Sequence, residues 1–211
     1  MNKATIVALF GLLTAGISEA GNVLATNFDE ATGAQRPLST SAGVGISTGG
    51  VVQLGSFTSA DPSGLIAGLT SPAGLAALLA DFINFGSTNA IGTDFAGLYA
   101  SDKSSPILGS SPLVGKSIYT LIGNAASLAA STELAIIRDD QSFAADAPVF
   151  AGLADISAGT SVVLFGNPNG PGFTTALGAA NSSLSLAPVP EPMSAVLLLT
   201  GLALAGRRRR A

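Results

Sequence analysis

Residues 117–122 read Ser-Ile-Tyr-Thr-Leu-Ile, and this stretch has the clearest β-strand character in the sequence. β-Branched and aromatic side chains dominate it, and such side chains pack well on the pleated surface of a sheet. Turn-forming residues separate it from other stretches of the same kind, and no strand–helix–strand alternation is visible. The sequence therefore predicts a mainly β body that resembles a β-sandwich. The other predicted strands are 22–28, 51–58, 133–138, 161–165 and, more weakly, 148–153.

One helix is predicted within this body. Ser71 can cap its N-terminus, and Pro72 suits its first turn. Residues 85–86, Phe-Gly, would end it. We expect this helix, one of at most two short helices, to pack across one end or one face of a sheet. The apolar side chains at helical spacing are Leu75, Leu78, Leu79 and Phe82.

Two stretches have the composition of irregular structure. Residues 167–172, rich in Asn, Pro and Gly, are predicted to form a loop. Residues 180–188 carry Ser and Pro and are predicted to form a flexible stalk between the body and a membrane. The expected organisation is a signal segment at 1–20, the body at 21–179, the stalk, and a tail at 189–211.

The charge of the body is strongly negative. Of the 13 acidic residues only Glu19 and Glu191 lie outside residues 21–189, which therefore carry 11 acids against four cations. Such a surface repels a phosphate backbone, so nucleic-acid binding is excluded. The chain contains no Cys, no His and no Trp, which excludes disulfides, thiol chemistry and histidine ligands. We expect no cofactor and no metal site.

The N-terminus has the three parts of a secretory signal peptide. Lys3 supplies the positive charge, and residues 4–17 form an uncharged, mostly apolar run. Ser18 and Ala20 then place small residues at the positions that precede a cleavage site. We expect a signal helix and cleavage after Ala20, with residues 23–25 as a second candidate site.

The C-terminus also has three parts in a fixed order. Pro190, Glu191 and Pro192 form an extended approach, because proline blocks helical and ladder pairing. Residues 193–206 carry no charge, and as a helix these 14 residues span only about 21 Å of the ~30 Å hydrocarbon core. A cationic block follows, which the positive-inside rule places in the cytoplasm. Its members are Arg207, Arg208, Arg209 and Arg210.

This tail resembles the PEP-CTERM sorting tail of bacterial exported proteins. The resemblance implies that Pro190, Glu191 and Pro192 are the recognition motif and that Arg207 to Arg210 are the membrane stop. It also implies processing by an exosortase, an integral-membrane transpeptidase, and an association with exopolysaccharide, biofilm or cell-surface assembly. An ordinary short one-pass anchor is the alternative, and the tail implies nothing about the fold of the body.

Two glycine-rich segments resemble catalytic motifs but lack their context. Residues 45–49 fit the G-x-S-x-G elbow of serine hydrolases, yet the chain has no His to act as base, and nothing marks Lys103 or Lys116 for that role. Residues 109–117 resemble a phosphate-binding loop, but five residues instead of four separate its glycines. A strand is also predicted after it, where the motif requires a helix. Both are interpreted as loops.

The acidic residues leave two further hypotheses open. Asp139, Asp140 and Asp146 could offer oxygen ligands to Ca²⁺, although a solvated turn is the simpler interpretation. A pair of carboxylates could also serve glycoside hydrolysis, although stacking aromatic residues are scarce.

The leading functional expectation is a non-enzymatic surface or extracellular-matrix protein with a structural or adhesive body. It would be exported, held at the inner membrane through its C-terminal helix, and then released to the cell surface or matrix. Its expected partners are the exosortase, the membrane and exopolysaccharide. The alternatives are a secreted carboxylate-dependent hydrolase acting on glycans and a Ca²⁺-dependent adhesin.

Overall fold

The fold is described from a computed structural model. The description covers residues 21–28, 34–46, 49–86, 89–91, 96–105, 107, 110–145, 151–155 and 161–190. Within these ranges the protein is mainly β, with two short α-helices and several sheets, as expected from the sequence. The predicted signal helix and the predicted C-terminal membrane helix lie outside the described residues.

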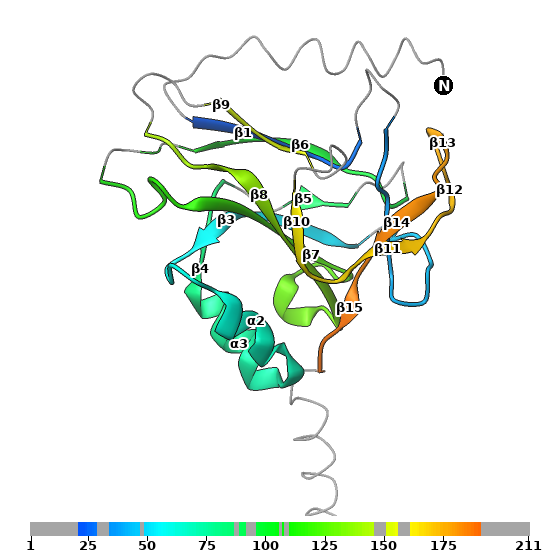
Figure 1. Cartoon of the computed structure of the whole chain (residues 1–211), viewed down its shortest axis with the longest axis horizontal. Coiled ribbons are helices and arrows are strands. Elements are labelled where there is room, and N and C mark those ends of the chain that lie inside the picture. The colour runs from blue at the N-terminus through cyan, green and yellow to red at the C-terminus, as the bar shows by residue number, and fades with distance from the viewer. Residues whose placement is uncertain are drawn as a thin grey trace, which may run out of the picture.

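An antiparallel sheet forms the centre of the molecule (Figure 1). Its strand order is β10–β8–β7–β3–β4, with β5 paired to β3 and β15 paired to β8. The predicted strands 117–122 and 133–138 lie in this sheet in full, and the predicted strands 51–58 and 161–165 lie in it except for one terminal residue each, so all four are confirmed. The strands are β3 (Val51–Phe57), β4 (Phe82–Asn84), β5 (Asn89–Ala90), β7 (Ser117–Gly123), β8 (Glu133–Ser142), β10 (Val162–Phe165) and β15 (Ala187–Pro188).

A smaller three-stranded sheet lies over one face of the central sheet (Figure 1). It has the order β6–β1–β9, formed by β6 (Ala100–Ser105), β1 (Gly21–Thr26) and β9 (Ala151–Asp155). β1 runs antiparallel to β6 and parallel to β9. Between the two sheets lies a buried apolar cluster, which includes Val23, Val52, Leu54, Ile122 and Ile137.

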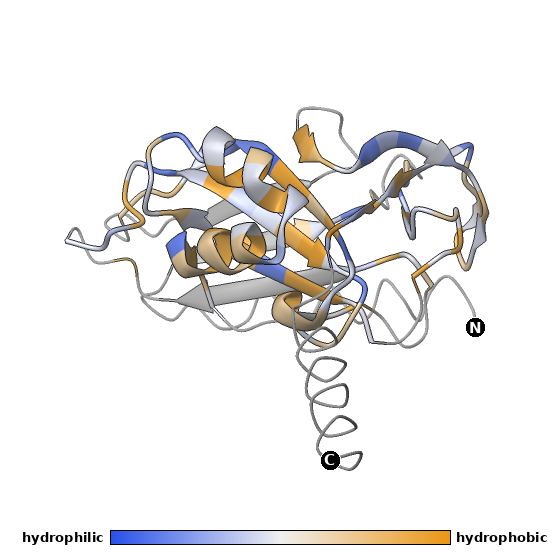
Figure 2. Ribbon diagram, turned by 90° about the horizontal axis from the view of Figure 1, so that it is seen from below, coloured by the Kyte–Doolittle hydropathy of each residue, from blue (hydrophilic) through white to orange (hydrophobic). Residues whose placement is uncertain are grey.

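The helices cover the opposite face of the central sheet (Figures 1 and 2). They are α2 (Ser63–Ala67), the 3-10 turn η1 (Gly68–Thr70), α3 (Pro72–Asp81) and the 3-10 turn η2 (Leu128–Ala130). A second apolar cluster lies beneath them, including Phe57, Leu75, Leu78, Leu121 and Ile136. The prediction that the helix packs on a sheet face is therefore confirmed.

Burial on both faces explains the composition of the central strands. In β7, Ile118 and Ile122 belong to the cluster between the sheets, whereas Tyr119 and Leu121 belong to the cluster under the helices. Successive side chains of a strand point to opposite faces, so a strand with both faces covered needs apolar residues at nearly every position. The mostly apolar composition of residues 117–122 is therefore a consequence of three stacked layers.

The predicted helix forms, but it is shorter than expected. Ser71 caps it by accepting a hydrogen bond from the Gly74 N–H at 3.1 Å, and Pro72 occupies its first turn, as predicted. It ends at Asp81, because Phe82 turns extended and opens β4. β4 pairs with β3 through Phe82 and Phe57, so sheet pairing overrides the helical spacing of Phe82.

The prediction of a loop at 167–172 is wrong for most of its length. Residues Asn167–Pro171 form β11, which pairs antiparallel with β14 (Ser182–Ser185) in the order β11–β14–β2, where β2 is Leu38–Ser39. β11 is an edge strand with a register shift, and edge strands tolerate prolines because one side of the ladder needs no N–H donors. A short hairpin follows, formed by β12 (Thr174–Thr175) and β13 (Gly178–Ala179).

The prediction of a flexible stalk at 180–188 is also wrong. β14 and β15 lie within this segment, and Leu184 and Leu186 are fully buried in the core. The hydroxyl of Ser39 lies 2.8 Å from that of Ser183 and 2.7 Å from that of Ser185, which satisfies three buried serines. Serine thus serves here as a buried strand residue, and the body extends through Val189.

Candidate functional site

The predicted sorting residues begin where the fold ends. The Val189 N–H donates to the Thr132 carbonyl oxygen at 2.8 Å, and its side chain is buried under the helices. Pro190 follows directly and is half-buried. Glu191, Pro192, Arg207, Arg208, Arg209 and Arg210 lie outside the described residues, as does the expected cleavage residue Ala20. None of the helices in the part of the chain that the structure describes is long and apolar enough to cross a membrane.

Lys116 has a structural role. Its ammonium group donates to the carbonyl oxygens of Phe57 at 2.8 Å and Thr58 at 2.6 Å, where β3 ends. These two bonds hold the Lys116 side chain against the backbone at the end of β3. Ser47, the serine of residues 45–49, lies outside the described residues.

Residues 109–117, which resemble a phosphate-binding loop, are followed by a strand, as predicted from the sequence. Ser117 opens β7, so a strand stands where a phosphate-binding loop would lead into a helix. The rejection of a nucleotide site at this segment is therefore supported by the fold.

Asp139 and Asp140 lie in an irregular part of β8. Between Tyr119 and Ser117, two steps along β7 are matched by four steps along β8, from Arg138 to Ser142. Asp139 is 6% exposed and accepts hydrogen bonds from the Gln141 N–H at 2.9 Å and the Ser161 hydroxyl at 3.4 Å. Burial raises the pKa of Asp139 to about 6, and the neighbouring Asp140 charge acts in the same direction.

Asp146, the third member of the Ca²⁺ hypothesis, lies outside the described residues. Within the described residues, no three His, Cys, Asp or Glu side chains are grouped so that they could hold a metal ion.

The Asp139 carboxyl is expected to make stability depend on pH. Because its folded pKa of about 6 exceeds the ordinary aspartate pKa of 3.8, the folded state binds more protons between these values. Its contribution to stability is therefore greatest below about pH 4 and is lost as the pH rises through 6. Asp139→Asn, which keeps an acceptor for the Gln141 N–H, should be more stable than the wild type at pH 7 by roughly 1–2 kcal/mol.

Urea unfolding of both proteins between pH 4 and pH 8 measures this difference. The stability gain of Asp139→Asn should grow from pH 4 to pH 6 and then stay constant. Asp140→Asn, which changes an exposed neighbour on the same strand, is the matched control and should show a smaller change. A stability gain for Asp139→Asn that does not vary with pH would contradict the raised pKa of Asp139.

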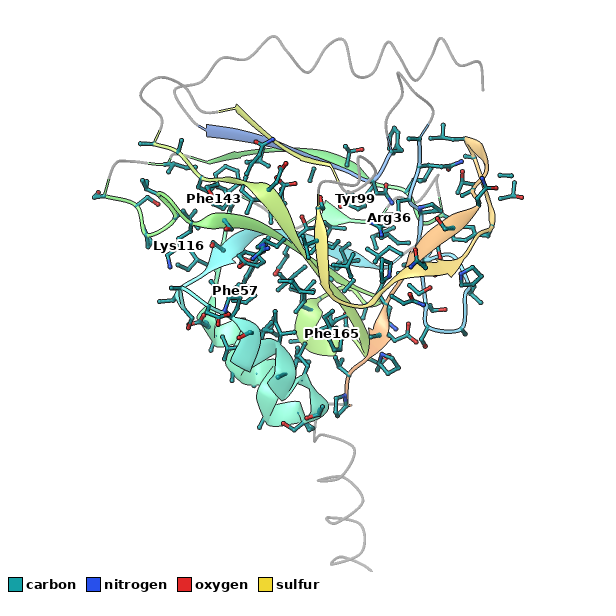
Figure 3. The ribbon with its side chains drawn as sticks, in the orientation of Figure 1. Arg36, Phe57, Tyr99, Lys116, Phe143 and Phe165 are labelled. Carbon is teal, nitrogen blue, oxygen red and sulfur yellow. The ribbon has the colours of Figure 1, made fainter. Side chains whose placement is uncertain are left out.

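A cavity of about 580 Å³ lies between the helices and the central sheet. Its apolar wall includes Ile66 of α2 and Leu164 and Phe165 of β10, and its polar groups belong to Asp61, Tyr119 and Arg138. Phe57 and Phe165 lie on the helix side of the sheet (Figure 3), in the same apolar cluster as Tyr119. The cavity therefore combines a rigid apolar wall with a few polar groups, as small-molecule sites do.

Sheet pairing places Tyr119 beside Arg138. The two residues are direct partners in the β7–β8 register, and both line the cavity. The Tyr119 ring packs edge-on against Phe57, with centroids 4.9 Å apart, and is only 6% exposed. Burial raises the pKa of Tyr119, so the phenol stays neutral at physiological pH.

Asp61 adds a negative charge at the mouth of the cavity. One of its oxygens accepts from the Ser63 N–H and the other from the Ser63 hydroxyl, both at 2.9 Å. These bonds lower the pKa of Asp61, so the carboxylate is ionised at neutral pH.

The polar residues of this cavity were not identified from the sequence as site residues. In the sequence, Tyr119 was identified only as a strand residue, and Arg138 only as a neighbour of Asp139 and Asp140. No local motif links them to Asp61, because cross-strand pairing and helix packing bring the three together.

The fold and cavity define a mainly β, three-layered protein with an amphipathic cavity on the helix side of its central sheet. No protein-family model, curated protein or solved structure matches the chain. A proposal for the function can therefore rest on the two predicted terminal signals, on the fold and on the cavity.

Proposed function

We propose that the chain is an exported surface or extracellular-matrix protein, sorted by an exosortase through its C-terminal tail, with a structural or adhesive body. The order of parts in the tail carries the proposal: Pro190-Glu191-Pro192, then the uncharged residues 193–206, then Arg207 to Arg210. The N-terminal signal, with cleavage after Ala20, supports export independently. In this proposal the arginines stop transfer at the cytoplasmic face of the membrane.

The body is consistent with such a role. A three-stranded sheet packed over the central sheet supports the description of the body as sandwich-like. A compact β-rich domain of net negative charge suits a surface protein without disulfides. Release from the inner-membrane intermediate would leave this body at the cell surface or in the matrix, where exopolysaccharide is the proposed partner.

The mature C-terminus tests the proposal. The full chain is produced together with its exosortase, and the surface-exposed protein is analysed by intact-mass spectrometry. We expect the mass to show loss of the arginine cluster by processing close to Pro190-Glu191-Pro192. A surface-exposed protein that still ends in Arg207 to Arg210 would refute exosortase sorting.

The absence of a stalk gives a second prediction. β15 is paired to β8 and Val189 is hydrogen-bonded to Thr132, so the folded body directly precedes Pro190. The active site of the exosortase needs an extended substrate, and the folded body next to Pro190 hinders the approach of the enzyme to the motif. A Gly/Ser spacer of about six residues between Val189 and Pro190, with an end-to-end distance of roughly 13 Å, should therefore speed processing.

Pulse-chase labelling followed by mass spectrometry compares the processing rates. The control carries the same spacer between Ala176 and Leu177, in the exposed turn of the β12–β13 hairpin, and should be processed at the wild-type rate. Equal rates for the wild type and the Val189–Pro190 insertion would show that the body does not restrict access.

A further inference from the structure

We propose that the cavity between α2 and the central sheet binds a small amphipathic monocarboxylate. The carboxylate would pair with Arg138 at the mouth, and the apolar body of the ligand would lie against Ile66, Leu164 and Phe165. This inference is independent of the sorting tail and goes beyond the proposed function.

Arg138 is the group that would recognise the anion. Arg36 donates to the Pro168 carbonyl oxygen at 3.1 Å, and Lys116 donates to two carbonyl oxygens. Arg138 instead lines the cavity beside the neutral Tyr119 phenol and, within the described residues, forms no ion pair with a carboxylate. A guanidinium has five N–H donors in a planar fork, so several remain for a ligand carboxylate.

The position of this guanidinium is defined by the sheet. Arg138 lies between Tyr119 of β7 and Val162 of β10 in the pairing register, and its side chain is exposed while lining the cavity. Its register partner Tyr119 is buried and forms part of the cavity wall. A ligand carboxylate can thus stay at the water boundary, where the cost of desolvating it is low.

The walls define the remainder of the ligand. Ile66, Leu164 and Phe165 are each half-buried, so part of their apolar surface is exposed, and a ligand can cover it. Burial of apolar surface is worth about 25 cal/mol per Å². A volume of about 580 Å³ accommodates a body of one ring or a short acyl chain.

Asp61 restricts the charge that the cavity accepts. Its carboxylate also lines the cavity and is ionised at neutral pH, so it repels a second negative charge. A monoanion can place its charge at Arg138 and its apolar end away from Asp61. A dianion such as phosphate has no apolar part for the walls and carries more charge toward Asp61.

Tyrosine fluorescence offers a direct test on the full chain. The chain has two tyrosines and no Trp, and Tyr119 lines the cavity. Titration with 3-phenylpropanoate or octanoate should change the tyrosine emission with saturation, and Tyr119→Phe should remove most of this change. The two probes separate an aromatic acid from a fatty acid as the preferred ligand, and inorganic phosphate should produce no saturable change.

Calorimetry with the same probes tests the role of Arg138. Arg138→Gln should weaken binding of the better probe about tenfold, as expected for the loss of a charge-assisted hydrogen bond. Arg36→Gln removes the same charge away from the cavity and should change binding less than twofold. The neutral analogue 3-phenylpropanol should bind the wild type about tenfold more weakly than 3-phenylpropanoate.

Three results would overturn the proposal. The first is that neither acid binds the wild type with saturation. This result does not depend on whether any variant folds. Another is equal affinity for the acid and the alcohol. The third is equal weakening by Arg138→Gln and Arg36→Gln, which would indicate a general charge effect.

Discussion

Replacing Asn27 by alanine is expected to lower the free energy of unfolding by about 3–5 kcal/mol. The Asn27 side chain is fully buried and joins three segments of the chain. Its amide nitrogen donates to the carbonyl oxygens of Gly97 at 2.7 Å and Arg36 at 3.1 Å, and its oxygen accepts from the Tyr99 N–H at 2.8 Å. Alanine would leave three backbone groups without these partners, and an unsatisfied buried group costs about 1–3 kcal/mol.

Urea unfolding followed by circular dichroism measures this loss. Asn181→Ala is the matched control, because Asn181 is exposed in the short connection before β14, and its change should stay within about 0.5 kcal/mol. A loss below about 1 kcal/mol for Asn27→Ala would mean that water or a rearranged loop replaces the amide.

Replacing Gly55 by alanine should cost about 3 kcal/mol or prevent folding. Gly55 lies in β3 between its partners Asn84 of β4 and Tyr119 of β7. A Cβ atom there would overlap the Ile83 carbonyl oxygen and would lie 2.8 Å from the Phe82 ring. The first contact is to backbone, so no side-chain rotation relieves it, and β4 would have to move away from β3.

Gly64→Ala provides the opposite result within the same chain. Gly64 lies in α2, and a Cβ atom at this position meets nothing within 4 Å. Alanine also favours a helix over glycine by up to about 1 kcal/mol, so this variant should be as stable as the wild type or more stable. Equal losses for Gly55→Ala and Gly64→Ala in thermal unfolding would contradict the steric argument.

Strand and helix positions were largely predictable where local composition agrees with the final packing. The stretch 117–122 and the Ser71-Pro72 helix start are both found, because β-branched residues and a capping hydroxyl act over a few residues. The errors occur where distant pairing overrides composition. Phe82 leaves the helix to pair with β3, and the serines near 183 are buried against Ser39.

The cavity could not be predicted from the sequence. Its polar groups are ordinary residues in their local context, and no spacing rule links a strand tyrosine to an exposed aspartate before a short helix. The β7–β8 register sets Tyr119 beside Arg138, and the packing of α2 brings Asp61 to the same opening. Long-range register therefore creates the site.

The sequence by itself determined the mainly β class, the start of α3, the acidic charge, the exclusion of cysteine and histidine chemistry, and the order of residues on which the predicted terminal signals rest. These depend on composition and on interactions between near neighbours. Only the tertiary structure decided that the chain up to Val189 belongs to the folded body, that both faces of the central sheet are covered, and that Arg138 lines a cavity with an apolar wall. Each of these depends on which distant strands pair, because strand pairing moves side chains between core, surface and site without changing the local sequence.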